Sequence, residues 1–371
     1  MKSLHGLLLT AILVCAVSAG AGVSRVPGTP ETVVLDNGLL KITLVPELNG
    51  TVCGWEYLPQ KRPFIRPLKY RVEKVDLLPD RIFTSQDGFR CRIWGIKHKF
   101  IDPMRVEKLE AGPDGGCMLT MTAPQTCGQE LALVCRMRLL PDSTVLTGSF
   151  EVTNRQKATV SCSLWFNCVL FMSDRPEPVL VPVRSGVERI GKLGMTPAGK
   201  DGVLTELHEG SRNMYFAALR PWVAKAAADR PGVAVLKIDD PAPEKLVLYT
   251  HKSDGLHTME ILSSPEKIRV GKTLIRKFEL LYFPSLSSLR DVCGRFGIDV
   301  KDGALEIEAA CPAAGSVWKI NGKEYDIPAL GPGRLHRIEA VCRPGETLKI
   351  TIGGQEYSIP GQLSADLKTV R

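Results

Sequence analysis

Short apolar runs separated by turn residues fill most of the chain and follow the two-residue period of β-strands. In TVLTGSFEVTN, for example, Leu146, Phe150 and Val152 alternate with Thr147 and Glu151. Comparable runs, among them CMLTMTA, ELALVCRMRLL, GVAVLKID and TLIRKFELLYF, recur as far as residue 284, with Pro, Gly, Asp and Asn between them. Many short strands in one segment predict packed antiparallel sheets, so residues 28–284 are expected to form a large β-sandwich in an all-β protein.

The clearest turn signal is Asp36-Asn37-Gly38, which lies between the apolar runs TVVL and LLKITLV. Asn-Gly favours a tight hairpin because both residues tolerate a positive φ angle. Pro46 then ends the second run, since proline cannot continue a strand interior. The sequence therefore predicts that a β-hairpin opens the sandwich.

A different spacing follows the last long strand. Leu286, Leu289, Val292 and Phe296 recur at helical intervals within SLSSLRDVCGRF, where the composition of the chain also shifts. This pattern predicts a helical connector over residues 285–299, between two domains.

Residues 300–362 contain an internal repeat. LEIEAAC (305–311) matches HRIEAVC (336–342), and INGKEYDIP (320–328) matches IGGQEYSIP (352–360). One copy alone cannot bury its apolar face, so the two copies are expected to pack together as a small β module. Cys311 and Cys342 occupy equivalent ends of the copies, which leaves two alternatives, a disulfide between them or two unpaired thiols.

The N-terminus has the features of an export signal. Lys2 and His5 precede an apolar run from Leu7 to Val17, which is too short to span a bilayer comfortably. Small residues follow, and cleavage after Ala19 or Ala21 fits the usual pattern. Residues 1–21 are therefore predicted to be a cleaved signal peptide of a secreted or periplasmic protein, with an uncleaved anchor as the alternative. No later stretch is apolar enough to cross a membrane.

Charge and cysteine usage exclude several classes of function. A net charge of +8 permits an acidic substrate without requiring one. The basic residues do not cluster and no recognition motif is present, so no nucleic acid partner is expected. Eleven cysteines without a C-x-x-C pair argue against a structural zinc site. No phosphate-cradling glycine loop or H-E-x-x-H motif occurs, and neither a metal nor a cofactor is expected.

Three stretches in order carry a resemblance to a known family. They are NGLLKITLVPELNG, RMRLLPDSTVLTGSFEVTNRQKATVSCSLWFN and HTMEILSSPEKIRVGKTLIRKFELLYF, and the resemblance that they carry covers about residues 31–284. In this order the chain resembles the galactose mutarotase-like (aldose 1-epimerase-like) superfamily, including its secreted bacterial branches. Asn49-Gly50 stands where that group usually has two glycines. The resemblance implies a large β-sandwich with a sugar site on one concave sheet.

In catalytic members of that superfamily a glutamate acts as base, and histidines act as acid and as partners of sugar oxygens. Glu260 is the position that matches this glutamate, and His98, in WGIKHKF, is the candidate first histidine. Asn167 stands where a strand histidine is common. Since Asn cannot shuttle a proton near neutral pH, the resemblance implies at most a partial catalytic set.

Aromatic and basic residues near these positions are candidates for substrate binding, because sugar rings stack on aromatic side chains. Trp165 alternates with Asn167, so both should share one face of a strand. Trp94 and Arg92 form an aromatic and basic neighbourhood suited to a carboxylated sugar. His257 would face away from Glu260 in a regular strand, whereas a bulge would change that. A place in the core is the alternative for each tryptophan.

Carbohydrate binding outside the cytoplasm is the leading hypothesis, with an oligo- or polysaccharide as partner. A sugar epimerase, or a polysaccharide lyase or hydrolase that uses Glu260 as base, is the enzymatic alternative. A structural or assembly protein of the cell envelope is the third. Resemblance at the level of the fold does not choose among them.

Overall fold

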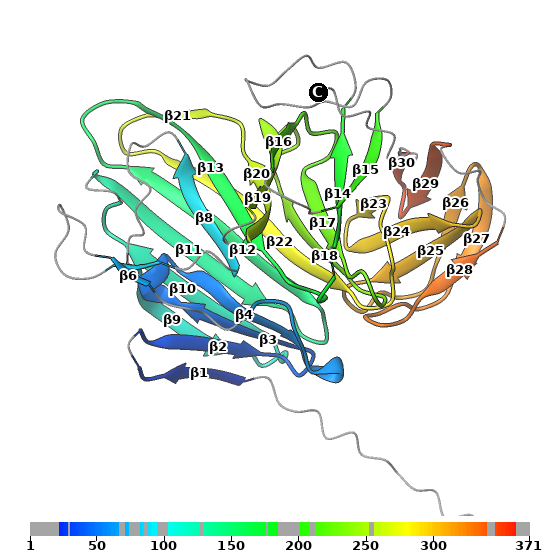
Figure 1. Ribbon diagram of the computed structural model, residues 1–371, viewed down its shortest axis with the longest axis horizontal. Coiled ribbons are helices and arrows are strands. Elements are labelled where there is room, and N and C mark those ends of the chain that lie inside the picture. The colour runs from blue at the N-terminus through cyan, green and yellow to red at the C-terminus, as the bar shows by residue number, and fades with distance from the viewer. Residues whose placement is uncertain are drawn as a thin grey trace, which may run out of the picture.

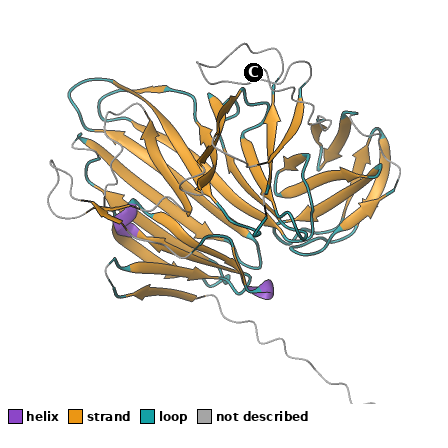
Figure 2. Cartoon of the chain, viewed as in Figure 1, coloured by secondary structure: helices purple, strands orange, loops and turns teal. Residues whose placement is uncertain are grey.

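The computed structural model shows a chain built almost entirely of antiparallel β-strands (Figure 2). It describes residues 22–28, 30–66, 71–73, 82–84, 88–94, 103–126, 129–175, 177–184, 201–207, 212–251, 256–339 and 346–360. In that part of the chain the only helices are the 3-10 turns Pro46–Leu48 and Leu58–Gln60. No helix there is long and apolar enough to cross a membrane. The predicted all-β class is confirmed, whereas the expected signal peptide lies outside the described residues.

Two large sheets, here called sheet I and sheet II, form the main domain (Figure 1). Sheet I has the order β1 (Gly22–Val26), β2 (Thr32–Asp36), β3 (Leu40–Val45), β4 (Thr51–Tyr57), β8 (Gly88–Trp94), β13 (Val160–Val169), β20 (Leu256–Leu262), β19 (Lys245–His251) and β16 (Arg212–Phe216), with β5 (Arg62–Pro63) beside β4 and β21 (Glu266–Ile268) beside β13. Sheet II has the order β15 (Gly202–Leu207), β14 (Pro178–Val183), β17 (Trp222–Ala226), β18 (Val233–Ile238), β22 (Thr273–Phe283), β12 (Val145–Asn154), β11 (Leu131–Leu139), β10 (Cys117–Ala123) and β9 (Arg105–Ala111). A separate pair, β6 (Arg71–Glu73) and β7 (Ile82–Thr84), completes this part of the chain.

The apolar faces of the two sheets meet in one core. Phe89 and Phe166 of sheet I pack against Phe278 of sheet II, with ring centroids 4.7 and 6.1 Å apart. All three side chains are buried, as the alternation in their strands predicts. The expected large antiparallel sandwich is therefore confirmed.

The predicted hairpin at Asn37-Gly38 joins β2 to β3. Gly38 has a φ of 83°, in the region that favours glycine. The Asn37 side-chain oxygen accepts hydrogen bonds from the backbone N–H groups of Leu39 and Leu40, while its amide donates to the carbonyl of Ser143 at 2.9 Å. Asn37 therefore closes its own turn and ties it to the turn between β11 and β12.

The predicted helix over residues 285–299 is wrong. The chain instead runs irregularly from Pro284 to β23 (Asp291–Cys293) and turns at Gly294 into β24 (Phe296–Lys301). Leu286 and Leu289 are buried against sheet II, so their spacing reflects a segment that crosses an apolar surface. The backbone N–H of Leu286 is bonded to a side chain, Glu308, rather than to a preceding helical turn.

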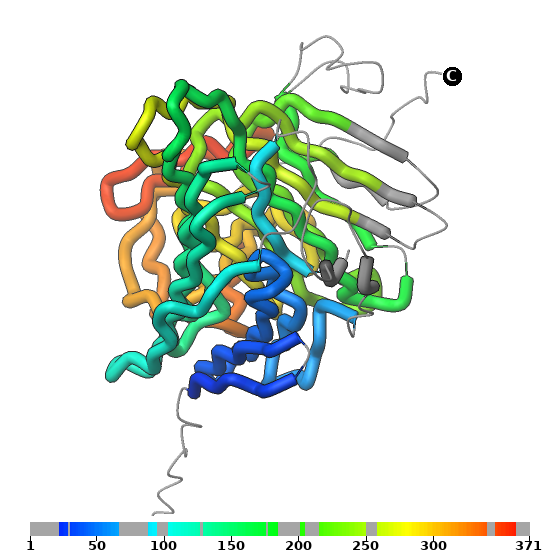
Figure 3. The backbone as a smooth tube through the Cα atoms, turned by 90° about the vertical axis from the view of Figure 1, so that its left-hand side faces the viewer, coloured from blue at the N-terminus to red at the C-terminus, as the bar shows by residue number. Residues whose placement is uncertain are grey.

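The C-terminal module consists of two four-stranded sheets packed face to face. One sheet has the order β23, β24, β25 (Ala304–Ala309) and β28 (His336–Ile338); the other has the order β27 (Lys323–Ile327), β26 (Ser316–Ile320), β29 (Leu348–Ile352) and β30 (Gln355–Ile359). Because β23 and β24 complete the first sheet, the module begins before the predicted boundary at residue 300. Its orange and red segments stay together in the view turned by 90° (Figure 3).

The internal repeat appears in the module as an approximate two-fold symmetry. Equivalent strands of the two copies pair with each other, β25 with β28 and β26 with β29. At the centre of the first pair, Glu306 lies opposite its repeat equivalent Arg337, and the two side chains form an ion pair of 3.0 Å. The packing of two copies into one β module, expected from the repeat, is therefore present.

All eight cysteines that the structure describes are free thiols, and seven of them are buried. Cys311 is one of the eight, and Cys342 lies outside the described residues. Burial raises the pKa of the Cys135 and Cys168 thiols to about 12, so neither is reactive at neutral pH. In this part of the chain the cysteines serve as small apolar core residues.

A buried carboxylate holds the module against the main domain. Glu308 is fully buried and accepts hydrogen bonds from the backbone N–H groups of Ser285, Leu286 and Gly333, at 2.9, 3.1 and 2.7 Å. Desolvation raises the pKa of Glu308 to about 7, while the three N–H groups act in the opposite direction. The connection between the domains therefore depends on a group that titrates near neutral pH.

Stability should depend on pH through Glu308. Its pKa in the folded protein is about 7, above the ordinary value of 4.5, so the folded protein binds this proton more tightly than the unfolded chain does. The resulting contribution to the free energy of unfolding is present in full below pH 4.5 and is lost as the pH rises through about 7. Glu308→Gln cannot ionise and should remove on the order of 3 kcal/mol of pH dependence from the free energy of unfolding. Urea unfolding of both proteins across this range measures the difference. Glu356→Gln, on the exposed side of β30, is the matched control, and an unchanged pH dependence in Glu308→Gln would contradict the assignment.

Candidate functional site

The register of three neighbouring strands of sheet I brings a polar cluster together. Asn167 of β13 lies between Arg90 of β8 and Glu260 of β20, directly opposite both. Residues Met259 and Ile261, on either side of Glu260, are buried in the core. Since side chains alternate along a strand, Glu260 and Asn167 lie on the outer face of sheet I, away from sheet II.

Glu260 is the centre of this cluster. Its Oε2 accepts a hydrogen bond from the indole Nε1 of Trp165 at 2.7 Å. Its Oε1 accepts from Asn167 Nδ2 at 2.9 Å and from the Thr258 hydroxyl at 2.6 Å. The Glu260 side chain is 6% exposed, so three donors compensate for most of the water that the carboxylate has lost.

Two opposing effects act on the pKa of Glu260. Burial raises the pKa of Glu260 above its ordinary value. Hydrogen bonds from Thr258, Trp165 and Asn167, together with the positive charge of Arg90, limit that rise. Asn167 is itself buried, and its Oδ1 has no hydrogen-bond partner among the described residues. The cluster thus retains an unused acceptor beside a carboxylate.

An aromatic pair lies next to Glu260 on the same face. Trp94, at the end of β8, is 47% exposed and meets Trp165 edge to face, with ring centroids 5.4 Å apart. Arg92 lies opposite Trp165 on β8 and is half-buried. The exposed indole of Trp94 thus offers an apolar ring face beside the polar groups of the cluster.

The structure brings together most of the residues that the sequence singled out. Trp165, Asn167 and Glu260 are joined by hydrogen bonds, and Trp94 and Arg92 lie beside them. His98 is outside the described residues, and His257 lies in β20 but its side chain is not described. No group of three or more His, Cys, Asp or Glu side chains within the described ranges could hold a metal ion.

Two members of the cluster, Thr258 and Arg90, were not among the predicted site residues. Each lies two residues from a predicted site residue on the same strand, Thr258 before Glu260 and Arg90 before Arg92. The two-residue period therefore contained a signal for both. The hydrogen bond of Thr258 to Glu260 lies within β20 and follows that period, whereas the place of Arg90 beside Asn167 depends on which strands are neighbours, and a single sequence does not contain that information.

Comparison with solved structures identifies the architecture of the main domain. The Slr1438 protein from Synechocystis sp. PCC 6803 matches with a TM-score of 0.50 and 14% identity, over 71% of this chain and 99% of that one. A galactose mutarotase-like protein from Clostridium acetobutylicum matches with a TM-score of 0.52 and 9% identity, over the same shares. The main domain has the galactose mutarotase-like fold. YeaD from Salmonella typhimurium matches with a TM-score of 0.50 and 10% identity, over 70% of this chain and 93% of that one.

The galactose mutarotase-like fold accounts for only part of the chain. Because Slr1438 is covered almost completely, the remainder of this chain has no counterpart in it. No protein-family model matches the sequence, and no curated protein does so significantly. At identities this low the matches establish the fold alone, and the function must be argued from the site.

Proposed function

We propose that this protein binds an oligo- or polysaccharide on the outer face of sheet I, over Trp94 and Trp165. The observation that carries the proposal is the Glu260 network beside the exposed indole of Trp94. A sugar ring has an apolar C–H face that stacks on an aromatic ring, and hydroxyls at its edge that need polar partners. The cluster offers an aromatic surface for the ring and polar groups for the hydroxyls on neighbouring strands.

Glu260 acts first as a positioning residue. Its hydrogen bond to the indole N–H fixes the Trp165 ring, and that ring in turn supports Trp94. Asn167 Oδ1, which has no partner within the described ranges, is an acceptor for a sugar hydroxyl. Arg92, beside Trp165, supplies positive charge for a carboxylated sugar.

A second candidate function is the interconversion of sugar anomers. This reaction needs a base that removes the proton of the anomeric hydroxyl and an acid that protonates the ring oxygen. The raised pKa of Glu260 favours it as the base, since a carboxylate with a raised pKa is a stronger proton acceptor. The carboxylate has four lone-pair sites and three donors, so one site on Oε2 is available to the hydroxyl.

Export from the cytoplasm is part of the proposal and rests on the leader sequence of residues 1–21. Expression of the full chain in a bacterium should yield a mature protein that begins after Ala19 or Ala21. N-terminal sequencing of the periplasmic and culture fractions tests this. Retention of Met1 in a membrane fraction would instead indicate an uncleaved anchor.

Loss of the exposed indole should weaken glycan binding. Trp94→Ala removes the stacking surface and should reduce affinity by roughly ten-fold or more for any uncharged glycan that the wild type binds on an array. The side chain is half-exposed, so the fold should tolerate the change. Val317→Ala removes a similarly exposed apolar side chain from the module and serves as control. Equal affinity of wild type and Trp94→Ala would exclude this surface as the binding site.

Glu260→Gln separates binding from catalysis, because glutamine keeps the size of the side chain but cannot accept a proton. If Glu260 is a base, anomer interconversion measured by polarimetry or NMR should fall by about 100-fold or more, while glycan affinity changes by less than about ten-fold. Glu324→Gln, an exposed change in the module, is the control. Wild-type protein that binds a glycan without interconverting its anomers would limit the function to binding.

A further inference from the structure

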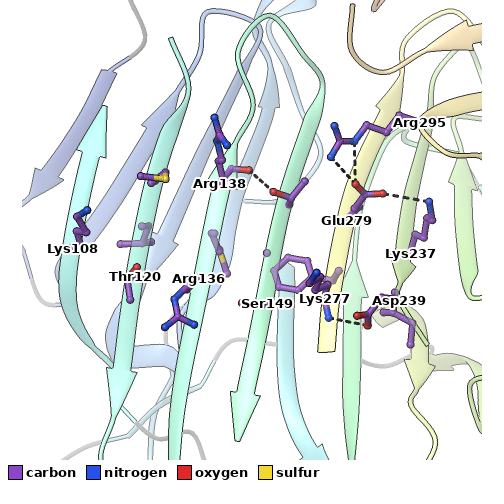
Figure 4. Close-up of a pocket in the computed structure, with 17 residues that line it drawn as sticks. Lys108, Thr120, Arg136, Arg138, Ser149, Lys237, Asp239, Lys277, Glu279 and Arg295 are labelled. Atoms are coloured by element: carbon purple, nitrogen blue, oxygen red, sulfur yellow. Dashed lines mark hydrogen bonds and ion pairs between the residues drawn. The ribbon is translucent and has the colours of Figure 1, made fainter. Parts of the chain in front are cut away.

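The outer face of sheet II is only partly covered. Near its β14–β17–β18 side, Trp222 and Phe283 pack under Leu286, Leu289 and the module. The adjacent part, over β10, β11, β12 and the middle of β22, remains open and forms a groove of about 720 Å³ (Figure 4). This volume falls in the range of ordinary ligand sites. The core of the sandwich separates this groove from the Glu260 cluster on sheet I.

Basic side chains from several strands and from the module line the groove. Six of its lining residues are cationic and only two are acidic. The six are Lys108, Arg136, Arg138, Lys237, Lys277 and Arg295. Arg295 comes from the turn between β23 and β24, so the docked module supplies one edge of the site (Figure 4).

The cations differ in how far neighbouring acids already pair with them, and Lys108 pairs with Glu110 while Arg136 pairs with Glu151. Glu279 forms ion pairs with Arg295, at 3.0 Å, and with Lys237, at 3.4 Å. These three side chains together therefore carry one net positive charge. Lys277 forms no ion pair with another described residue. Arg138 is paired with Asp114, but both side chains are more than 40% exposed, with values of 47% and 43%. Exposed pairs of this kind contribute little and are exchanged readily for another carboxylate.

The two acids and the hydroxyls define the ligand further. Glu279 accepts hydrogen bonds from Arg295 and Lys237, and Asp239 accepts one from the backbone N–H of Lys277. The hydroxyls of Thr120, Thr147 and Ser149 also line the groove. A ligand that carries both carboxylates and hydroxyl donors matches this mixture, because carboxylates pair with Arg and Lys while hydroxyls donate to Glu279 and Asp239. A chain of phosphates lacks such donors, so it could pair with the basic residues but could not donate to the two acids.

We propose that this groove is a second binding site, which takes an acidic oligosaccharide. Among its lining residues the one aromatic side chain is Phe278, which is buried in the core. Stacking therefore contributes little here, in contrast to the tryptophan pair on sheet I, and charge provides the selectivity. The groove does not depend on sugar binding at sheet I, so either site can be refuted alone.

The test uses the mature full-length protein and a defined oligogalacturonate as probe, with titration calorimetry at low and moderate salt. The wild type should bind the probe, and its affinity should fall as salt increases. Arg138→Gln/Lys277→Gln should weaken binding by about ten-fold. Lys323→Gln/Lys349→Gln, a matched loss of two charges on the module outside the groove, should change affinity by less than about two-fold.

Three controls make the result decisive. A neutral maltooligosaccharide of the same length should not bind at the groove, and Trp94→Ala should keep full affinity for oligogalacturonate. A single-stranded oligonucleotide of equal charge should bind far more weakly. Absence of oligogalacturonate binding, unchanged affinity in Arg138→Gln/Lys277→Gln, equal binding of the oligonucleotide, or loss of binding in Trp94→Ala would each overturn the proposal.

Discussion

The antiparallel register of β8, β13 and β20 is the constraint on which the candidate site depends. Met259 and Ile261 are buried in the core, and a slip of one residue would exchange them with Glu260. Core packing therefore fixes the register, and the register places Glu260 opposite Asn167. The polar cluster on the outer face is positioned by apolar contacts on the inner face, and its own hydrogen bonds then refine the geometry.

The same dependence links the module to the groove on sheet II. The two copies of the repeat bury each other about the Glu306–Arg337 pair, so the module has a core of its own. Docking then covers one part of the outer face of sheet II and carries Arg295 to the edge of the part that stays open. Glu308 of the module accepts hydrogen bonds from the backbone N–H groups of Ser285 and Leu286 in the connecting segment, and from Gly333 within the module.

The sequence predicted the faces of strands well and their neighbours poorly. A two-residue period states which side a residue occupies, and this was enough to place Trp165 with Asn167. It does not state that β13 lies between β8 and β20, so the place of Arg90 near Glu260, across Asn167, was missed. The helix predicted after residue 284 failed for a related reason. A three-residue apolar spacing also arises where an irregular segment crosses an apolar surface, and only the tertiary structure distinguishes the two cases.

Stability alone does not explain the Glu260 cluster. Buried charged groups can often be replaced by apolar side chains of similar volume with no loss, or with a gain of about 1–4 kcal/mol. The buried pair of Lys225 and Glu177 has an architectural role, since Lys225 also donates to the Leu170 carbonyl at 2.7 Å and so ties β17 to the segment after β13. The Glu260 cluster differs because Asn167 Oδ1 has no partner within the described ranges and an indole ring beside it is exposed. A bound ligand would satisfy that acceptor and cover that ring, which is the physical reason to regard this cluster as a binding site.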